Sequence, residues 1–176
     1  FYSNIYKYPG MATELSLPNL LPAISNKEVV LDKLRSSTFI GIDFGTSTTV
    51  VSYTVIGDNA TPIKTDVIPI RQLNLDGSYT ENHLVPSCIA WYDNKLLIGQ
   101  TAKQLKSKLT YGRNIWYSFK MKLGIDSGPT YYSSELNSGH PQATIERPLD
   151  AAKVFFKYLK AEIYHFVQSN NLPSTS

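Results

Sequence analysis

Residues 39–56 read FIGIDFGTSTTVVSYTVI, and this stretch decides the fold of the chain. Its apolar beginning and its Thr-, Val- and Tyr-rich end both favour extended chain, so the sequence predicts two strands, 38–43 and 48–57, joined by a turn at 44–47. Gly45 can adopt a positive φ in this turn without a Cβ clash, which would let successive backbone N–H groups converge on one point. We therefore expect a hairpin that binds an anion such as a nucleotide phosphate. The hydroxyl groups beside these amides belong to Thr46, Ser47 and Thr48.

Asp43 ends the first predicted strand, and the alternation of side chains puts it on the same face as Phe39 and Gly41. A carboxylate in this place would repel a phosphate. A Mg²⁺ ion resolves the conflict, because it binds carboxylates directly or through its waters and neutralises phosphate oxygens at the same time. Asp43 is therefore the predicted metal-binding residue.

The same letters fit other motifs less well. The tripeptide at 43–45 spells the magnesium motif of protein kinases, but the 42 residues before it leave no room for the Gly-rich loop, strand lysine and catalytic loop. The order Asp-Phe-Gly-Thr also differs from that of an aspartic protease, and neither Gly-x-x-x-x-Gly-Lys-Ser/Thr nor Gly-x-Gly-x-x-Gly occurs. An ordinary hairpin with glycine in its turn stays open as the alternative.

The string IGIDFGTS at 40–47 closely resembles the first phosphate motif of the actin-like ATPases, and among them the seventy-kilodalton heat-shock chaperone family. Further segments resemble that family in the same order along the chain. They are the Pro-Ser strand at 85–91, the Ile-Gly-x-x-Ala-Lys helix start at 97–103, the Lys-x-x-x-Gly segment at 120–124 and the opening of a long helix at 147–150. Ordered matches of this kind are far more specific than any one of them.

The resemblance implies an α/β fold, namely an incomplete actin-like ATPase (ribonuclease H-like) first lobe with a mixed sheet and flanking helices. Residues 1–37 would be an N-terminal extension, and 38–176 the first lobe of a nucleotide-binding domain. Within the lobe, the core would comprise 38–86 and 147–171, with an inserted subdomain at about 87–146. In the family, ATP lies between two lobes, so we expect this chain to be the N-terminal part of such a domain.

The resemblance also implies residue roles. Asp43 would bind Mg²⁺ through water, and Gly45, Thr46, Ser47 and Thr48 would hold the phosphates of ATP or ADP. The catalytic residue would be Lys120, since counting back from Gly124 selects it over Lys122. Its ammonium would stabilise the charge shifted in phosphoryl transfer. Without the resemblance, a lysine on a helix is most often simply solvated.

The expected activity of the intact protein is ATP hydrolysis that controls the binding of unfolded polypeptide clients, with co-chaperones as further partners. The isolated chain should have little or no ATPase activity and bind nucleotide weakly, because the opposite wall of the cleft is absent. Two alternatives stay open. One is a sugar-kinase-like phosphotransferase of the same superfold, against which the Pro-Ser strand and the Lys120 segment argue. The other is a binding or scaffold protein that keeps the fold without turnover.

Composition narrows the class of protein. The 176 residues are 42% hydrophobic and 18% charged, which is typical of a globular domain, and the mild, dispersed net charge of +3 gives no reason to expect a nucleic-acid partner. No apolar stretch approaches the roughly 20 residues that span a bilayer, and Pro18 and Pro22 interrupt the Leu-rich N-terminal segment, so we expect a cytoplasmic protein without a membrane partner.

The single Cys88 is expected to be a small core residue, and His83, His140 and His165 lack the spacing of a zinc site.

Hydrophobic patterns and turn residues predict the other elements. The predicted helices are 26–35, two that start near Gln100 and Asn114, and a long one at 149–169. The predicted strands are 65–71 with Pro69 at an edge or bulge, 87–92, and 95–98, which is joined to the strand before it by a turn at Asp93-Asn94. A short strand at 130–132 is open as an addition. Residues 72–84 and the rest of 126–138 are expected to be loops.

Overall fold

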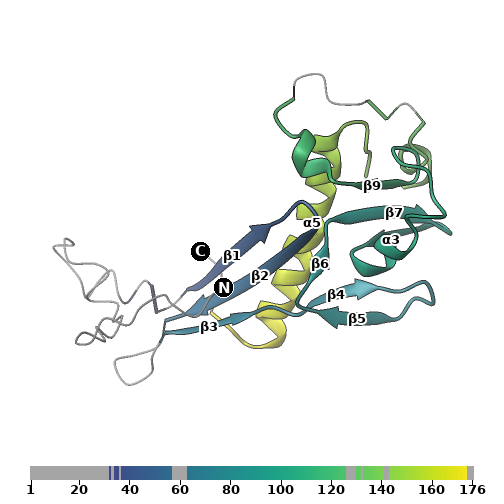
Figure 1. The fold of residues 1–176 in the computed structure, drawn as a ribbon. Coiled ribbons are helices and arrows are strands. Elements are labelled where there is room, and N and C mark those ends of the chain that lie inside the picture. Colours follow the sequence, from purple (N-terminus) through teal and green to yellow (C-terminus); the bar gives the residue numbers. More distant parts are fainter. Residues whose placement is uncertain are drawn as a thin grey trace, which may run out of the picture.

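A computed structural model of the chain describes residues 32, 34, 35, 37–56, 63–125, 130, 131, 133–140 and 143–173. These residues form a mixed α/β fold, in which antiparallel sheets pack against one long helix, α5 (Pro148–Ser169) (Figure 1). The coarse fold class is therefore as predicted. The helix predicted at 26–35 lies almost wholly outside the described residues.

The predicted hairpin is confirmed as β1 (Thr38–Phe44) and β2 (Thr48–Val55), which pair antiparallel with Phe44 opposite Thr49. The register places Asp43 opposite Val50 and Ile42 opposite Val51. Val51 is fully buried and Asp43 is exposed, so the aspartate lies on the outer face of the hairpin, as the alternation predicts. On its other side β2 pairs with β3 (Lys64–Val67) and β6 (Val85–Pro86).

The single strand predicted at 65–71 is wrong, because the chain forms two strands in different sheets. Pro69, which has no N–H to donate to a ladder, lies between β3 and β4 (Ile70–Leu73). The loop predicted at 72–84 is also wrong in part, since β4 pairs with β5 (Tyr79–Asn82) around a turn that contains Gly77 at φ 87°. All four residues of β5 are exposed, so this strand carries no apolar alternation.

The third sheet has β7 (Cys88–Tyr92) between β8 (Lys95–Ile98) and β9 (Ile115–Tyr117). The predicted β7–β8 hairpin is confirmed, with Asp93 and Asn94 at φ 51° and 52° in its turn. A short helix, α3 (Gln100–Gln104), starts as predicted. The helix predicted near Asn114 is wrong, because Ile115 and Trp116 are fully buried as strand β9 against β7.

Between β9 and α5, the described residues form only short helical pieces. A 3₁₀ turn, η1 (Phe119–Lys122), follows β9, and α4 (Leu136–Gly139) comes later. Thr130 and Tyr131 are not in a strand, in keeping with the loop expected for 126–138 and without the short strand left open at 130–132. The predicted subdivision into a core and an inserted subdomain stays a prediction.

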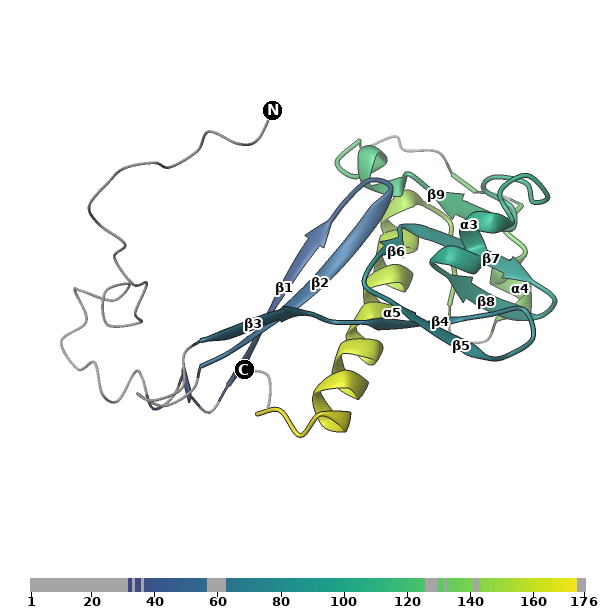
Figure 2. The same ribbon diagram turned by 60° about the horizontal axis from the view of Figure 1, so that its bottom comes forward.

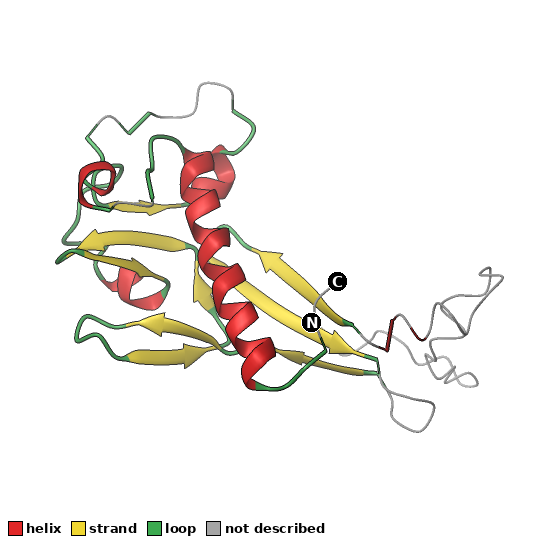
Figure 3. Ribbon diagram, turned by 180° about the vertical axis from the view of Figure 1, so that it is seen from behind, coloured by secondary structure: helices red, strands yellow, loops and turns green. Residues whose placement is uncertain are grey.

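Helix α5 is confirmed almost to the residue. Pro148 occupies its first turn, and Asp150 Oδ2 accepts a hydrogen bond from the Arg147 N–H at 3.1 Å, as in a capping box. The helix crosses behind the hairpin sheet and the β8–β7–β9 sheet and covers one face of both (Figures 2 and 3). Its buried side recurs at the predicted spacing, with Ala151, Ala152, Phe155, Leu159, Ile163 and Val167 in the core. None of the described helices has the apolar length needed to cross a lipid bilayer.

Candidate functional site

The loop between β1 and β2 is tight, but not for the predicted reason. Gly45 does not have a positive φ; among the described residues, the glycines that do are Gly77, Gly99, Gly112 and Gly124. Instead, a Cβ added at Gly45 would lie 2.1 Å from the carbonyl oxygen of Thr48. Glycine is therefore required here because two backbone segments approach each other closely.

Ser87 forms two hydrogen bonds to the backbone of this loop. Its N–H donates to the Ser47 carbonyl at 3.0 Å, and its hydroxyl donates to the Gly45 carbonyl at 2.9 Å. Because the Ser87 hydrogen is used in this way, the Thr49 hydroxyl donates to Ser87 Oγ at 3.0 Å. Both side chains are buried. Residue-by-residue reasoning missed both of them as site residues, although Ser87 belongs to the Pro-Ser segment that resembles the family.

Several hydrogen-bond donors of the loop are unused. Within the described part of the chain, the backbone N–H groups of Gly45, Thr46 and Ser47 donate to no other residue. The hydroxyls of Thr46, Ser47 and Thr48 likewise have no partner among those residues. Because the carbonyls face Ser87 while these donors stay unused, the loop is suited to an anion.

Asp43 lies one residue before Phe44, at the end of the hairpin. Its exposed carboxylate forms no ion pair with a described residue. No group of three or more His, Cys, Asp or Glu side chains capable of holding a metal is present in the described ranges. Asp43 could therefore contribute a single carboxylate to a Mg²⁺ ion, which commonly keeps several waters and takes other ligands from substrate phosphates.

Lys120 reaches the hairpin from a distant part of the sequence. Its Nζ donates to the Phe44 carbonyl at 2.5 Å, and the same atom lies 5.5 Å from the centre of the Phe44 ring. The lysine lies in the 3₁₀ turn η1, not in the predicted helix. The structure thus brings the predicted catalytic residue into contact with Phe44, which lies in the chain between the predicted metal-binding residue Asp43 and the predicted phosphate-binding residues Gly45, Thr46, Ser47 and Thr48.

An aromatic cluster fixes this arrangement. The Phe44 ring lies 6.1 Å from that of Phe119, 6.0 Å from that of Phe155 and 4.9 Å from that of Phe156, measured between ring centres. Phe119 and Phe155 are almost fully buried. The end of β1 is therefore packed against both η1 and α5, and aromatic pairs at such distances contribute about 1 kcal/mol each beyond area burial.

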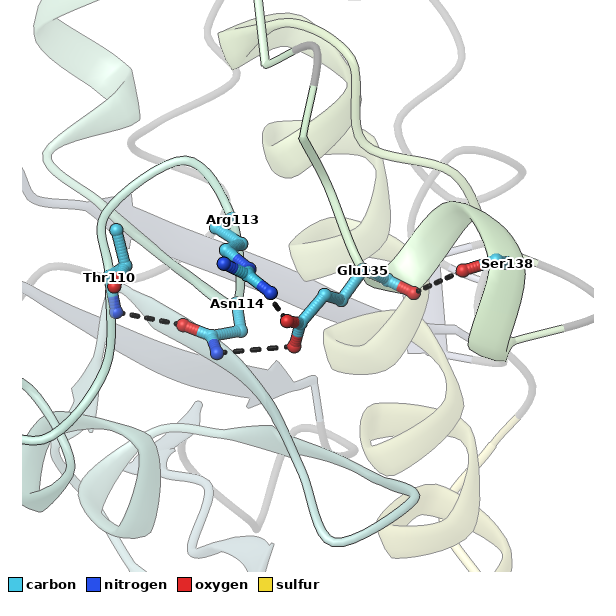
Figure 4. A network of polar contacts seen from close by, with 5 residues as sticks. All are labelled: Thr110, Arg113, Asn114, Glu135 and Ser138. Atoms are coloured by element: carbon cyan, nitrogen blue, oxygen red, sulfur yellow. Dashed lines mark hydrogen bonds and ion pairs between the residues drawn. The ribbon is translucent and has the colours of Figure 1, made fainter.

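A separate polar network lies away from this site (Figure 4). The Glu135 carboxylate accepts from Arg113 Nε at 2.6 Å and from Asn114 Nδ2 at 3.2 Å, and Asn114 Oδ1 accepts from the Thr110 N–H at 2.8 Å. The hydroxyl of Ser138 donates to the Glu135 carbonyl at 3.2 Å. Because these groups form hydrogen bonds with one another, the network links the loop before β9 to the segment around α4.

The structure also contains a groove of about 480 Å³ along α5, between Asp150 and Ala161. Leu96 and His140 line its opposite side. None of the predicted site residues lines this groove, so the candidate site is the exposed end of the hairpin.

Cys88 is buried in β7, as predicted. Burial raises the pKa of its thiol to about 11, so the thiol stays protonated at neutral pH. It is not a nucleophile of the site.

No protein-family model and no curated protein matches this chain. The functional proposal therefore depends on the geometry of the hairpin and on the residues gathered there.

Proposed function

We propose that residues 43–48 and Lys120 form the phosphate-binding part of a Mg-nucleotide site in an actin-like ATPase lobe of the heat-shock chaperone type. The observation that carries this proposal is the hydrogen bond of Lys120 Nζ to the Phe44 carbonyl at 2.5 Å. It joins two motifs 76 residues apart, and nothing in the sequence of either motif requires them to meet.

The proposed chemistry uses positioning and electrostatics. The unused N–H and hydroxyl donors of the loop would bind the β- and γ-phosphate oxygens of ATP, and Asp43 would hold Mg²⁺ through water. Lys120 is exposed, so its ammonium can leave the Phe44 carbonyl and move to the transferring phosphoryl group. A positive charge there stabilises the transition state without any covalent step by the protein.

The activity of the intact protein follows as part of the same proposal. It would hydrolyse ATP to ADP and phosphate and use the cycle to control binding of unfolded polypeptides, in the cytoplasm and with co-chaperones as partners. The antiparallel hairpin whose inner face is covered by the long helix α5 is consistent with an actin-like first lobe. The chain alone would contribute one wall of the nucleotide cleft and would bind Mg-ADP weakly.

The test is a titration of the isotope-labelled chain with Mg-ADP and Mg-ATP, followed by NMR. We expect the amide signals of residues 45–48 and of Lys120 to shift at millimolar nucleotide, and to shift less when Mg²⁺ is withheld. Asp43→Asn should remove the magnesium dependence. Asp66→Asn, an exposed aspartate on β3 of the same sheet, is the matched control and should leave it unchanged.

Four outcomes would contradict the proposal. Shifts that map to another part of the chain would place the nucleotide elsewhere, and the absence of shifts at 45–48 at any nucleotide concentration would remove the site. A submicromolar affinity measured by calorimetry would show that this chain is not half of a cleft. In the intact protein, ADP release that depends on an added sugar would favour the phosphotransferase alternative.

A further inference from the structure

The 3₁₀ turn that carries Lys120 has only four residues, and the hydrogen bonds that join it to its flanking residues are long. They measure 3.3 Å from the Met121 N–H to the Ser118 carbonyl and 3.2 Å from the Leu123 N–H to the Lys120 carbonyl. Ser118 precedes the turn with a φ of 53° and Gly124 follows it at 81°. Because 3₁₀ hydrogen-bond geometry is poor, so short a turn depends on outside contacts for its position.

Two such contacts lie on either side of Lys120. On one side, Phe119 is 1% exposed and packs against Phe44 and Phe155. On the other side, Lys122 Nζ donates to the Tyr111 hydroxyl at 2.6 Å. Lys120 therefore lies between Phe119, which is held by apolar packing, and Lys122, which is held by a hydrogen bond.

The hydrogen bond between Lys122 and Tyr111 is the first of a series of contacts that reaches the buried Tyr131. The Tyr111 and Tyr131 hydroxyl oxygens lie 3.1 Å apart, and because Tyr111 accepts from Lys122, its own hydrogen is free to point to Tyr131. Tyr131 is 6% exposed, and its ring fills the space above Gly112, where an added Cβ would lie 2.8 Å from the ring. Burial raises the pKa of Tyr131, and its contact with Tyr111 raises it further, so its hydroxyl stays neutral at physiological pH.

We propose that Lys122 and Tyr111 are positioning residues, which hold the 3₁₀ turn so that Lys120 reaches the end of the hairpin. This inference rests on the proposed function of Lys120. Lys120 and Lys122, which belong to the same turn, then have different roles. Lys122 is engaged with the tyrosine pair, and Lys120 is the one directed to the phosphate-binding loop.

The first experiment compares Tyr111→Phe with Tyr117→Phe in the 176-residue chain. The Tyr117 ring lies 4.9 Å from that of Tyr111, and its hydroxyl has no hydrogen bond to a described residue, so its substitution is a matched control. The readout is the NMR cross-peak between the Lys120 ε-methylene and the Phe44 ring, together with hydrogen exchange at the Lys120 ammonium. We expect Tyr111→Phe to weaken the cross-peak and to speed exchange about fivefold, the effect of about 1 kcal/mol. Tyr117→Phe should change neither.

The second experiment approaches the same contact from Lys122, which is half-buried and ends the 3₁₀ turn. Lys122→Met should reproduce the effect of Tyr111→Phe, and Lys122→Arg, which keeps a charged donor, should restore the Lys120 signals. Both variants should unfold at nearly the same urea concentration as the unaltered protein.

The outcomes separate this inference from the function on which it rests. An unaltered protein with a clear Lys120–Phe44 cross-peak that persists in Tyr111→Phe and Lys122→Met would overturn the positioning role and leave the nucleotide proposal standing. Absence of that cross-peak in the unaltered protein would overturn both. Loss of the cross-peak in both variants, with nucleotide shifts at 45–48 intact but Lys120 no longer responding, would support the inference.

Discussion

Replacing Gly45 by alanine tests whether the hairpin loop depends on close backbone approach. The added Cβ would lie 2.1 Å from the Thr48 carbonyl oxygen, far inside van der Waals contact, and the obstructing atom belongs to the backbone. The loop must therefore shift by about 1 Å or more, and overpacking of this kind costs about 1–3 kcal/mol. Because the shift moves the donors of Thr46 and Ser47, Gly45→Ala should also weaken Mg-nucleotide binding by about tenfold.

Gly41→Ala is the matched control on the same strand. There the added Cβ would lie 2.8 Å from Ser52 Oγ, the end of a side chain that can rotate away from its 3.5 Å hydrogen bond to the Gly41 carbonyl. Alanine in a strand interior is also about 0.5–1 kcal/mol more favourable than glycine, which offsets the rotation. We expect a change in unfolding free energy within about 0.5 kcal/mol, measured by urea denaturation. Equal effects of the two substitutions would refute the steric account of Gly45.

Other predictions concern single groups. In the intact protein, Lys120→Ala should lower ATP turnover by orders of magnitude while leaving nucleotide affinity largely intact, as measured by steady-state kinetics and calorimetry; unchanged turnover would remove Lys120 from the mechanism. Arg71→Met should cost about 2 kcal/mol in urea denaturation, because Arg71 binds Glu162 with two hydrogen bonds of 2.7 and 3.2 Å and the carboxylate, whose side chain is 11% exposed, would lose its partner. A double variant that also has Glu162→Leu should recover most of that loss, and a strictly additive result would contradict the pairing. Because the Cys88 pKa is raised from 9.0 to about 11 in the folded state, stability should be fully present below pH 9 and fall as pH rises toward 11. Cys88→Ala should abolish that part of the decline, and identical pH curves for the two proteins would show the thiol to be uninvolved.

The long helix and the hairpin could be predicted because packing and local preference agree in both. In α5, Phe155, Leu159 and Ile163 recur at helical spacing and all three are buried. In β2, the buried residues alternate with less buried ones, as a strand on a one-sided core requires. In such elements the burial pattern can be read directly from the sequence.

The β4–β5 hairpin could not be predicted in this way. β5 (Tyr79–Asn82) is exposed on both faces, so its sequence carries no alternation, and its pairing is decided by β4. β4 in turn contains Gln72, a polar residue that is 2% exposed. Its amide donates to the Leu84 carbonyl at 3.1 Å and accepts from the Gln100 N–H at 2.7 Å. Burial of glutamine is favourable only because both distant partners are present, and no local pattern shows them.

Strand β9 shows how tertiary structure overrides a local preference. Ile115 and Trp116 are compatible with either a helix or a strand, and the sequence alone favoured a helix near Asn114. The strand forms because β7 offers a free edge, against which Ile115 pairs with Ala90 and Trp116 with Ile89. The consequence reaches the candidate site, because a strand that ends at Tyr117 leaves room only for a 3₁₀ turn at Lys120.

The individual residues of the candidate site could be predicted from the sequence, but their arrangement in space could not, and Phe44 explains the difference. Reasoning from the motif assigned roles to Asp43 and Gly45 and passed over the residue between them. The carbonyl of Phe44 binds Lys120, while its ring packs against Phe119 next to that lysine and against the helix α5. One residue therefore couples the loop that would bind phosphate to the turn that would supply the positive charge. Because the Phe44 ring also packs against Phe155 and Phe156 of α5, the positions of the loop, Lys120 and the helix are linked through this one residue.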